Sequence, residues 1–382
     1  MDKISVVIPT KNEEKSIGIC IEKIQKVFNE HYIYGEIIVV DNSTDDTPEI
    51  AKRLGARVVV PNELGYGNAY RFGFEQASSD YIVMGDGDNT YDFSNIPILL
   101  EPLKRGEADL TMGSRFKGEI KKGAMPWHHQ YIGNPFLTWI FNKANKSNLS
   151  DTHSGFRAFT KEAYDKMKRD LKTTGMEFAS EMLEVAIKNN LKIAEVPITY
   201  YPRPKGSEPN LSSFSDGWRH LKHILLRTPT LLFLLPGFIL FLLGTLLVFL
   251  IWAPLNLWGV RLGIHSMIVG CLFAMVGYQI IFLGLFAKTY GVHQGLEKRD
   301  KITEIISKHI TLARGATAGL VIFLAGFFYT LKLLLNWIAS DYKDLPLLDQ
   351  DIAGFMLLVI GLQMIFYSIF LSMIGGRKGI KM

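Results

Sequence analysis

Cysteine is scarce in this sequence, since Cys20 and Cys271 are the only two among 382 residues and they lie far apart. This scarcity speaks against a disulfide framework, and a reducing compartment suits the N-terminal part of the chain. That part also lacks the long apolar core of a secretory signal, so we expect it to remain in the cytoplasm. The net charge of +5 is too small to indicate a nucleic-acid partner.

Charged side chains are absent from four long stretches of the second half, and each stretch can cross a hydrocarbon core of ~30 Å at ~1.5 Å per helical residue. The stretches are residues 231–252, 262–287, 315–331 and 352–376. Lys and Arg gather in the middle loop and in the C-terminal tail, whereas the opposite loops hold only Arg261 and Lys343, apart from Lys332, which can snorkel. The positive-inside rule therefore predicts that both termini are cytoplasmic, and we expect a multi-pass protein of a prokaryotic plasma membrane.

These features divide the chain into four expected parts. They are a cytosolic domain at 1–210, an interfacial amphipathic helix at 211–228, a transmembrane domain of two helical hairpins at 229–376, and a basic cytoplasmic tail at 377–382. Residues 288–314 form an expected amphipathic cytoplasmic loop inside the transmembrane domain. Both amphipathic segments carry apolar residues at helical spacing, which suits a bilayer surface. Packing against the protein itself is the alternative.

The first 210 residues alternate short β-branched runs with segments of helical period, such as ISVVIPT followed by SIGICIEKIQKVFNE. A further helix is expected from Thr47 as N-cap with Pro48 in its first turn. This repetition predicts an α/β domain with a mostly parallel sheet and ligands beyond the carboxyl ends of its strands. Candidate ligand residues follow three strands: residues 9–13, Asp41, and residues 86–88.

The segment GDGDNTYD places Asp86 and Asp88 in alternation at a strand end. Two such carboxylates can hold one divalent ion, which a nucleotide diphosphate would also bind. A calcium loop of the EF-hand type does not fit, because Tyr91 stands at the sixth position and Pro97 at the twelfth, where Gly and Glu are required. A solvated turn is the simpler alternative, since Asp and Gly dominate turns.

The segment LGYGNAYRFG lacks the third glycine of a dinucleotide fingerprint. Gly65 and Gly67 are expected either to let the backbone approach a sugar nucleotide or to form a tight turn. His128 and His129 could bind phosphate or a base, or could be ordinary exposed loop residues. No Ser-His-Asp pattern stands out.

Seven segments in order resemble glycosyltransferase family two, and specifically its dolichol-phosphate mannose synthase and polyprenyl-phosphate glycosyltransferase branch. They are VVIPTKNEE, EIIVVDNSTDDT, NELGYGNAYRFG, MGDGDNTYD, MGSRF, DTHSGFRAF and GMEFASE, within roughly residues 3–225. The two transmembrane hairpins resemble those of the larger members. The resemblance implies a GT-A fold, that is, a nucleotide-sugar-binding domain with a mostly parallel sheet.

The resemblance also implies site residues. The donor nucleotide would contact Pro9, Lys11, Glu13, Asp41, Gly65, Gly67 and Asp86. Mg²⁺ or Mn²⁺ would be held by Asp86, Asp88 and Thr90. The acceptor phosphate would meet Arg115, His129, Gln130, Asn134 and Arg203, with Asp88 and Arg115 as the catalytic pair.

Some positions depart from the family pattern. Lys11 stands where the synthases often have Tyr, and Thr90 stands where they often have Gln. In the acceptor region Gln130 and Asn134 replace Arg and Ser, which leaves His129 as a substitute ligand. Nucleobase stacking, metal coordination and acceptor binding are the functions that these departures affect.

The implied reaction is an inverting, metal-dependent transfer of one sugar from a donor of the GDP-mannose or UDP-glucose type to a polyprenyl or dolichyl phosphate. The acceptor is already anionic, so positioning and charge stabilisation suffice without a protein base. The expected partners are the nucleotide diphosphate sugar, the lipid phosphate and the bilayer, with no nucleic acid; homo-oligomerisation stays open.

The sequence leaves two alternative functions. A processive polysaccharide synthase is expected to carry Q-x-x-R-W, which this sequence lacks. A non-catalytic scaffold that binds sugar nucleotides or lipids would not need both Asp86 and Asp88.

Overall fold

The structure, a computed structural model, describes residues 3–204, 229–252, 262–293, 312–343 and 349–375, together with 218, 221 and 303–304. The chain forms two compact units, Met1–Ile224 and Leu225–Met382. The expected helix at 211–228, the centre of the loop at 288–314 and the tail at 377–382 lie outside the described residues, apart from the four single positions above.

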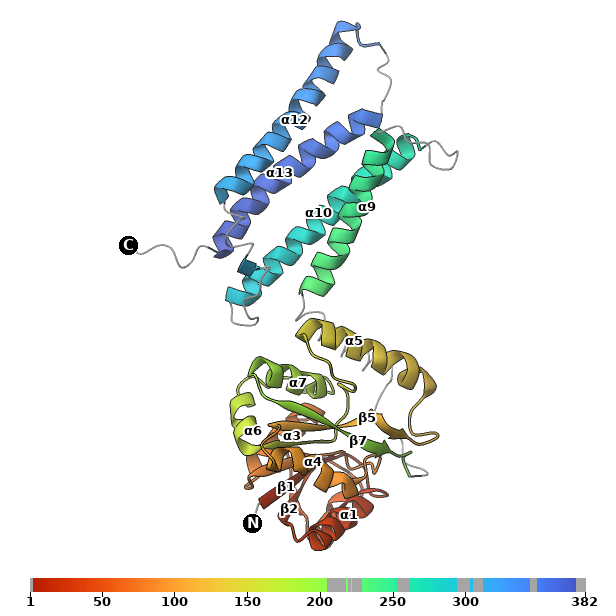
Figure 1. The fold of residues 1–382 in the computed structure, drawn as a ribbon, viewed down its shortest axis with the longest axis vertical. Helices are drawn as coiled ribbons and strands as arrows, with labels where there is room; N and C mark the ends of the chain where they lie inside the picture. The colour runs from red at the N-terminus through yellow and green to blue at the C-terminus, as the bar shows by residue number, and fades with distance from the viewer. Residues whose placement is uncertain are drawn as a thin grey trace, which may run out of the picture. The chain divides into compact units, whose positions relative to one another are not determined.

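The first unit is built on a seven-stranded sheet of order β3-β2-β1-β4-β6-β5-β7 (Figure 1). Its strands are β1 (Lys3–Thr10), β2 (Tyr34–Asp41), β3 (Arg57–Val59), β4 (Tyr81–Met84), β5 (Leu110–Ile120), β6 (Arg157–Thr160) and β7 (Ile193–Tyr200). Only β6 runs antiparallel to its neighbours, β4 and β5, among the strands that the structure describes. The prediction of a mostly parallel α/β sheet is confirmed.

Helices cover both faces of this sheet. They are α1 (Ile17–Glu30), α2 (Thr47–Arg53), α3 (Tyr66–Gln76), η1 (Phe93–Asn95), α4 (Ile96–Lys104), η2 (His129–Gly133), α5 (Asn134–Asn145), α6 (Lys161–Met167) and α7 (Phe178–Lys188). Alternate residues of β1, Ile4, Val6 and Ile8, join residues of α1 and α4 in one buried cluster. From α3, the ring of Phe74 packs against Phe159 and other aromatic rings of the α6 and α7 side, with centroids 5.0 Å from Phe159.

The start of α2 differs from the expectation. The helix already includes Thr47, and Asp46 occupies the cap position. The Thr47 hydroxyl donates to Asp45 Oδ1 (2.5 Å) and accepts from the backbone N–H of Glu13 (2.9 Å). Its side chain therefore links two loops at the strand ends, so it does not cap the helix.

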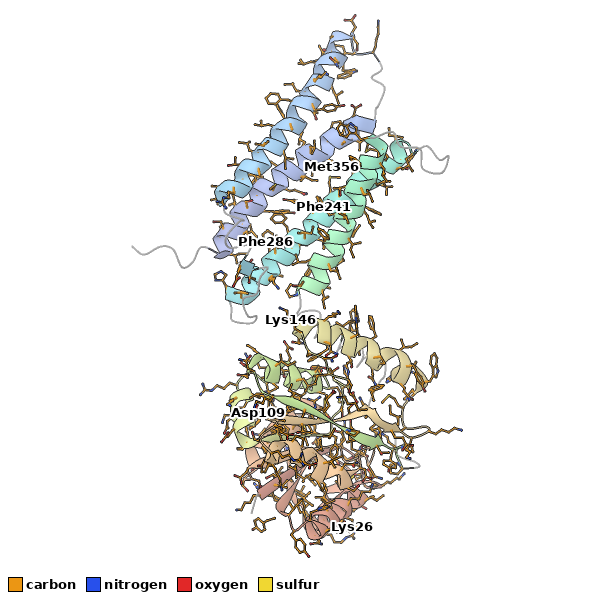
Figure 2. All side chains as sticks on the ribbon, viewed as in Figure 1. Lys26, Asp109, Lys146, Phe241, Phe286 and Met356 are labelled. Carbon is orange, nitrogen blue, oxygen red and sulfur yellow. The ribbon has the colours of Figure 1, made fainter. Side chains whose placement is uncertain are left out.

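Among its described residues, the second unit contains four helices that are long and apolar enough to cross a membrane, in agreement with the four predicted spans. They are α9 (Leu235–Trp252), preceded by η3 (Thr230–Leu234), α10 (Ile264–His293), α12 (Leu312–Ala339) and α13 (Asp349–Gly375). In the interior, Phe241 of α9 packs against a cluster that includes Met356 of α13, and Phe286 joins a second cluster (Figure 2).

Candidate active site

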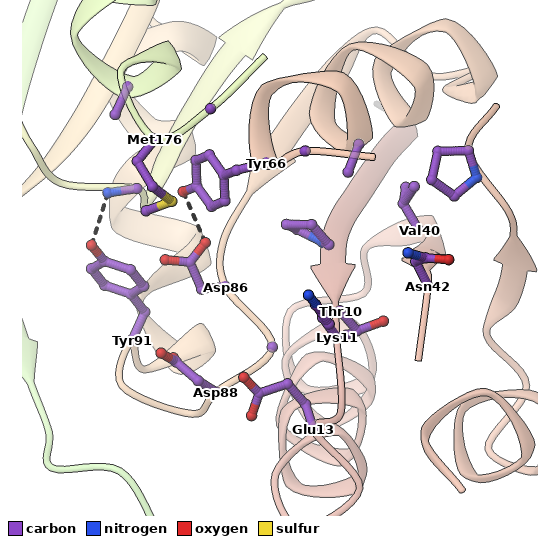
Figure 3. Close-up of a pocket in the computed structure, with 18 of the residues that line it drawn as sticks. Thr10, Lys11, Glu13, Val40, Asn42, Tyr66, Asp86, Asp88, Tyr91 and Met176 are labelled. Carbon is purple, nitrogen blue, oxygen red and sulfur yellow. Dashed lines mark hydrogen bonds between the residues drawn. The ribbon is translucent and has the colours of Figure 1, made fainter. Parts of the chain in front are cut away.

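A cavity of about 500 Å³ lies beyond the carboxyl ends of β1, β2 and β4 (Figure 3). Pro9 to Lys11 enter it from the end of β1, Val40 and Asn42 from the end of β2, and Asp86 to Asp88 from the segment after β4. This is the edge where parallel α/β sheets bind ligands. The predicted location of the site is therefore matched by a cavity.

Asp86 is held by two tyrosines of α3. Its Oδ1 accepts hydrogen bonds from the hydroxyls of Tyr66 (2.9 Å) and Tyr70 (3.0 Å). The two tyrosines lie one helical turn apart, so both reach the same carboxylate. Burial, and then the nearby charge of Asp88, raise the pKa of Asp86 to about 6. Such a carboxylate favours a cation beside it.

Asp88 is bonded through both of its oxygens. Oδ1 accepts from the backbone N–H (3.0 Å) and the hydroxyl (2.6 Å) of Thr90, which fixes the turn. Oδ2 forms an ion pair with Nη2 of Arg203 at 2.6 Å. Thr90 thus orients a carboxylate that already has a cationic partner.

Glu13 completes an acidic group at this point and faces Asp88 in Figure 3. Its side chain is buried, and Oε2 accepts from the Ser16 hydroxyl at 3.0 Å. Burial, and then the charge of Asp88, raise its pKa to about 7. Nη1 of Arg203 lies 3.6 Å from Glu13 Oε1, so one guanidinium bridges two acids.

Arg115 projects from β5 and is fixed in a buried pair with Asp151. Its Nε and Nη2 donate to the two carboxylate oxygens at 2.7 and 2.8 Å, and its guanidinium lies over the ring of Tyr200 at 5.2 Å. Bidentate bonds of this kind hold an arginine in one orientation. Arg115 lines the cavity on the side of Tyr91 and Tyr200.

The residues predicted for the donor nucleotide separate into two groups. Pro9, Lys11, Glu13, Gly65 and Asp86 line the cavity. Asp41 does not: it is buried and accepts hydrogen bonds from Thr10 (2.7 Å) and Ser43 (2.6 Å), while its neighbour Asn42 faces the cavity.

The two glycines of the GYG segment allow close approach of another part of the same chain. A Cβ on Gly67 would lie 2.4 Å from the carbonyl oxygen of Thr173, and one on Gly65 would lie 2.4 Å from that of Thr174. Gly65 also has a φ of 126°, which disfavours any side chain. Of the two, Gly65 lines the cavity and Gly67 does not.

The residues predicted for the acceptor phosphate also separate. Arg115 and Arg203 line the cavity, whereas His129, Gln130 and Asn134 lie in η2 and at the start of α5, outside its lining. Burial, and then the charges of His128 and Arg115, lower the pKa of His129 below 6.5. His129 therefore bears little charge near neutral pH.

Several residues that line the cavity were not predicted from the sequence. Besides Asn42, they include Tyr66, Tyr91, His153, Met176 and Tyr200. For Tyr66, the sequence offers a signal: Tyr66 and Tyr70 are spaced four residues apart on a predicted helix that precedes the Asp motif. The Tyr91 hydroxyl accepts from the Gly155 N–H at 2.8 Å. Tyr91 and Tyr200 become neighbours only when β7 joins the sheet, so their sequence positions do not predict the contact.

A divalent metal fits this site as a partner of two carboxylates. In the part of the chain that the structure describes, no group of three or more His, Cys, Asp or Glu side chains could hold a metal by itself. Asp86 and Asp88 would therefore need diphosphate oxygens and water as further ligands, as Mg²⁺ commonly does. The guanidinium on Asp88 Oδ2 indicates that this oxygen is suited to a cation.

Comparison with known proteins gives the following relatives. The family Glycosyl transferase family 2 matches residues 5–168, and the Glycosyltransferase family 2 C-terminal transmembrane region matches residues 285–375. The low-salt glycan biosynthesis hexosyltransferase Agl6 of Haloferax volcanii is 44% identical over 372 residues, covering 97% of this chain and 89% of that protein. A dolichyl-phosphate hexose transferase of the same organism is 32% identical over 219 residues, covering 56% of this chain and 90% of that protein.

Among solved structures, the glucosyl-3-phosphoglycerate synthase of Mycobacterium tuberculosis in complex with Mn²⁺, UDP and glucosyl-3-phosphoglycerate is similar, with 24% identity and a TM-score of 0.46 over 59% of this chain and 78% of that chain. The family matches and the near full-length relative agree with the order of motifs along the sequence and with the mixed α/β sheet. This chain belongs to glycosyltransferase family 2 and combines a GT-A-like catalytic domain with a C-terminal transmembrane region.

Proposed function

We propose that this glycosyltransferase transfers a single hexose, with inversion, from a nucleotide diphosphate sugar to a polyprenyl or dolichyl phosphate. One observation carries the proposal: two carboxylates, Asp86 and Asp88, and two arginines, Arg115 and Arg203, line one cavity of a membrane-attached domain. A donor diphosphate with its metal and an acceptor phosphate are the anionic groups that such a cavity suits.

The donor half of the site is built around the Asp motif. Asp86 and Asp88, supported by Thr90, would hold Mg²⁺ or Mn²⁺, and the bound ion would neutralise charge on the leaving nucleotide diphosphate. Pro9, Lys11 and Asn42 lie at the ends of β1 and β2, where the nucleoside would lie. These residues orient the donor.

The acceptor half needs positive charge and orientation, because a lipid phosphate attacks the anomeric carbon as an anion without a general base. Arg115 is pre-oriented by Asp151, and Arg203 lies at the metal side of the cavity. His129, Gln130 and Asn134 would bind the phosphate from η2 and α5 as neutral donors. Arg115 would supply the fixed charge.

The lipid nature of the acceptor is supported by the surface of η2 and α5. Leu137, Ile140 and Phe141 are buried, yet other large apolar side chains of these elements are exposed. These are Tyr131, Ile132, Phe136 and Trp139, together with Trp127 just before η2, with exposed fractions from 52% to 70%. Aromatic residues exposed beside acceptor residues suit the interface of a bilayer, where amphipathic rings gather.

The hexose is supported by two relatives, one named a hexosyltransferase and the other a dolichyl-phosphate hexose transferase. GDP- and UDP-sugars both remain candidate donors. We place the catalytic domain and both termini on the cytoplasmic side of the plasma membrane because Lys and Arg are concentrated in the loops of that side.

The test uses the full chain in membranes, with dolichyl phosphate and a panel of GDP- and UDP-hexoses, and identifies the lipid product by mass spectrometry. We expect one hexosyl phosphate lipid, formed only with Mg²⁺ or Mn²⁺. Asp88→Ala should lower the rate by at least about 100-fold. Asp165→Ala, an exposed position on α6, is the matched control and should retain the rate. Ordinary transfer by Asp88→Ala at saturating metal would refute the metal assignment, and chain elongation would favour a polysaccharide synthase.

A further inference from the structure

Arg203 pairs with Asp88, one of the two carboxylates of the Asp motif. Its Nη2 lies 2.6 Å from Asp88 Oδ2, and its Nη1 lies 3.6 Å from Glu13 Oε1. Both acids are buried, with exposed fractions of 5% and 7%. Without a cation, two buried carboxylates side by side would repel each other strongly. Arg203 therefore supplies the positive charge that keeps the acidic group together.

The end of β7 places this guanidinium. The backbone N–H of Tyr201 donates to the carbonyl of Thr90 at 2.9 Å, and Tyr200 pairs with Tyr91. The chain is thus fixed to the loop of the Asp motif only two residues before Arg203. The Arg203 side chain is 22% exposed, which gives it room to swing while the backbone stays attached.

A divalent ion and this guanidinium would compete for the same carboxylate oxygen, Asp88 Oδ2. Mg²⁺ binds oxygen at about 2.0–2.1 Å, and two cations on the same oxygen would lie within a few ångström of each other. At such distances like charges repel by several kcal/mol even at an effective dielectric constant of about 20. This repulsion favours departure of one cation when the other binds.

We infer that Arg203 is an exchangeable counter-cation: it occupies Asp88 before the donor binds and is displaced by the incoming metal toward the phosphates that the metal brings. This inference rests on the proposed function, because it takes Asp88 as a metal ligand. A guanidinium is well suited to the exchange, because its parallel N–H groups can bind the two oxygens of either a carboxylate or a phosphate. Arg203 is thereby a positioning residue that couples metal binding to nucleotide binding.

The experiment measures Mn²⁺ binding directly, by the loss of the free Mn²⁺ EPR signal, on the full chain in detergent. Titrations are made without nucleotide and with saturating GDP or UDP. Arg203→Ala should bind Mn²⁺ about tenfold or more tightly without nucleotide, because the competing cation is gone. Nucleotide should increase the Mn²⁺ affinity of Arg203→Ala less than it increases that of the wild type, by a similar factor, because no guanidinium moves from Asp88 to the phosphates.

Two further variants define the chemistry. Arg203→Lys keeps the charge and loses the fork, so its Mn²⁺ affinity should lie between those of the wild type and Arg203→Ala. Arg57→Ala removes an arginine that pairs with Glu36 at the other edge of the sheet, and it should bind Mn²⁺ like the wild type.

The outcomes separate the inference from the proposed function. If Arg203→Ala increases the Mn²⁺ affinity by the same factor with and without nucleotide, Arg203 repels the metal from a fixed position, and the exchange is wrong. Unchanged Mn²⁺ affinity of Arg203→Ala would also overturn the exchange. If Asp88→Asn loses Mn²⁺ binding while Arg203→Ala behaves like the wild type, only the role of Arg203 falls. If Asp88→Asn keeps the wild-type affinity, the metal assignment falls, and the exchange falls with it.

Discussion

At the scale of single residues, Arg115 illustrates how a neighbour determines what a charged side chain can do. Sequence motifs mark Arg115 for phosphate binding, but two of its nitrogens already donate to Asp151. The backbone N–H of Arg115 donates to the same carboxylate at 3.1 Å. Only 8% of the Arg115 side chain and none of the Asp151 side chain are exposed. Asp151 therefore fixes the direction in which the remaining nitrogen, Nη1, is presented.

Removing Asp151 should be strongly destabilising. Asp151→Ala leaves a buried guanidinium without its counter-charge, and loss of one partner of a buried pair costs about 3–5 kcal/mol. We expect a clearly lower apparent Tm of the full chain in detergent. Asp165→Ala removes one partner of an exposed pair with Lys168 and should cost less than about 1 kcal/mol. Equal Tm values for the two variants would show that Arg115 does not depend on Asp151.

The sequence predicted where the site lies in the fold better than it predicted the hydrogen bonds and ion pairs of the site residues. Residues after β1 and β4 were identified because polar residues that interrupt a buried strand must lie at its end. The orientation of Asp41 was missed, since its hydrogen bonds to Thr10 and Ser43 turn it inward and leave Asn42 facing the cavity. The Arg203 to Asp88 pair joins segments that only the folded sheet brings together. No local pattern contains such a contact.

At the scale of helices, both transmembrane hairpins pack through glycines spaced one heptad apart. In the first hairpin a Cβ on Gly277 would lie 2.3 Å from the backbone nitrogen of Phe241, and in the second a Cβ on Gly361 would lie 2.3 Å from that of Phe323. Each has a glycine seven positions earlier on its own helix: a Cβ on Gly270 would lie 3.1 Å from Val248 Cγ2, and one on Gly354 would lie 2.5 Å from Tyr329 Cδ1. Small residues let helices in a membrane approach closely. The two hairpins use one packing scheme.

A side chain at these glycines should separate the helices. Gly277→Leu forces atoms into the backbone of α9, and overpacking of this kind costs about 1–3 kcal/mol or more. We expect a lower Tm in detergent for this variant. Val276→Leu changes the adjacent residue, which is 42% exposed, and should have little effect. If both variants melt like the wild type, the close glycine contacts do not stabilise the hairpin.

The elements themselves were largely predictable, with informative exceptions. The four spans follow from charge-free length alone. The second was expected to end before Lys288, yet α10 continues to His293. Lys288 is buried within it, and its Nζ donates to Thr230 Oγ1 at 2.9 Å. The antiparallel direction of β6 was not predictable, because a strand pattern does not encode which neighbour it joins.

At the scale of the whole molecule, charge and span number together determine orientation. If all four candidate helices span the membrane, the chain returns to its starting side, and we expect the catalytic unit and the C-terminal tail to share one face. We expect the Lys- and Arg-rich loop between α10 and α12 on the same face, and the short connection between α12 and α13 on the other. The proposed use of a nucleotide sugar requires the first face to be cytoplasmic.

This orientation can be tested with single added cysteines, because Cys20 and Cys271 are both buried and should resist labelling. Ser340→Cys marks the connection after α12, and Lys52→Cys marks the exposed surface of α2 in the catalytic unit. A membrane-impermeant maleimide added to intact cells should label Ser340→Cys, and it should label Lys52→Cys only after the membrane is opened. Labelling of Lys52→Cys from outside would place the catalytic unit away from cytoplasmic nucleotide sugars. It would thereby contradict the topology that the positive-inside argument predicts, and with it the access of the catalytic unit to cytoplasmic nucleotide sugars.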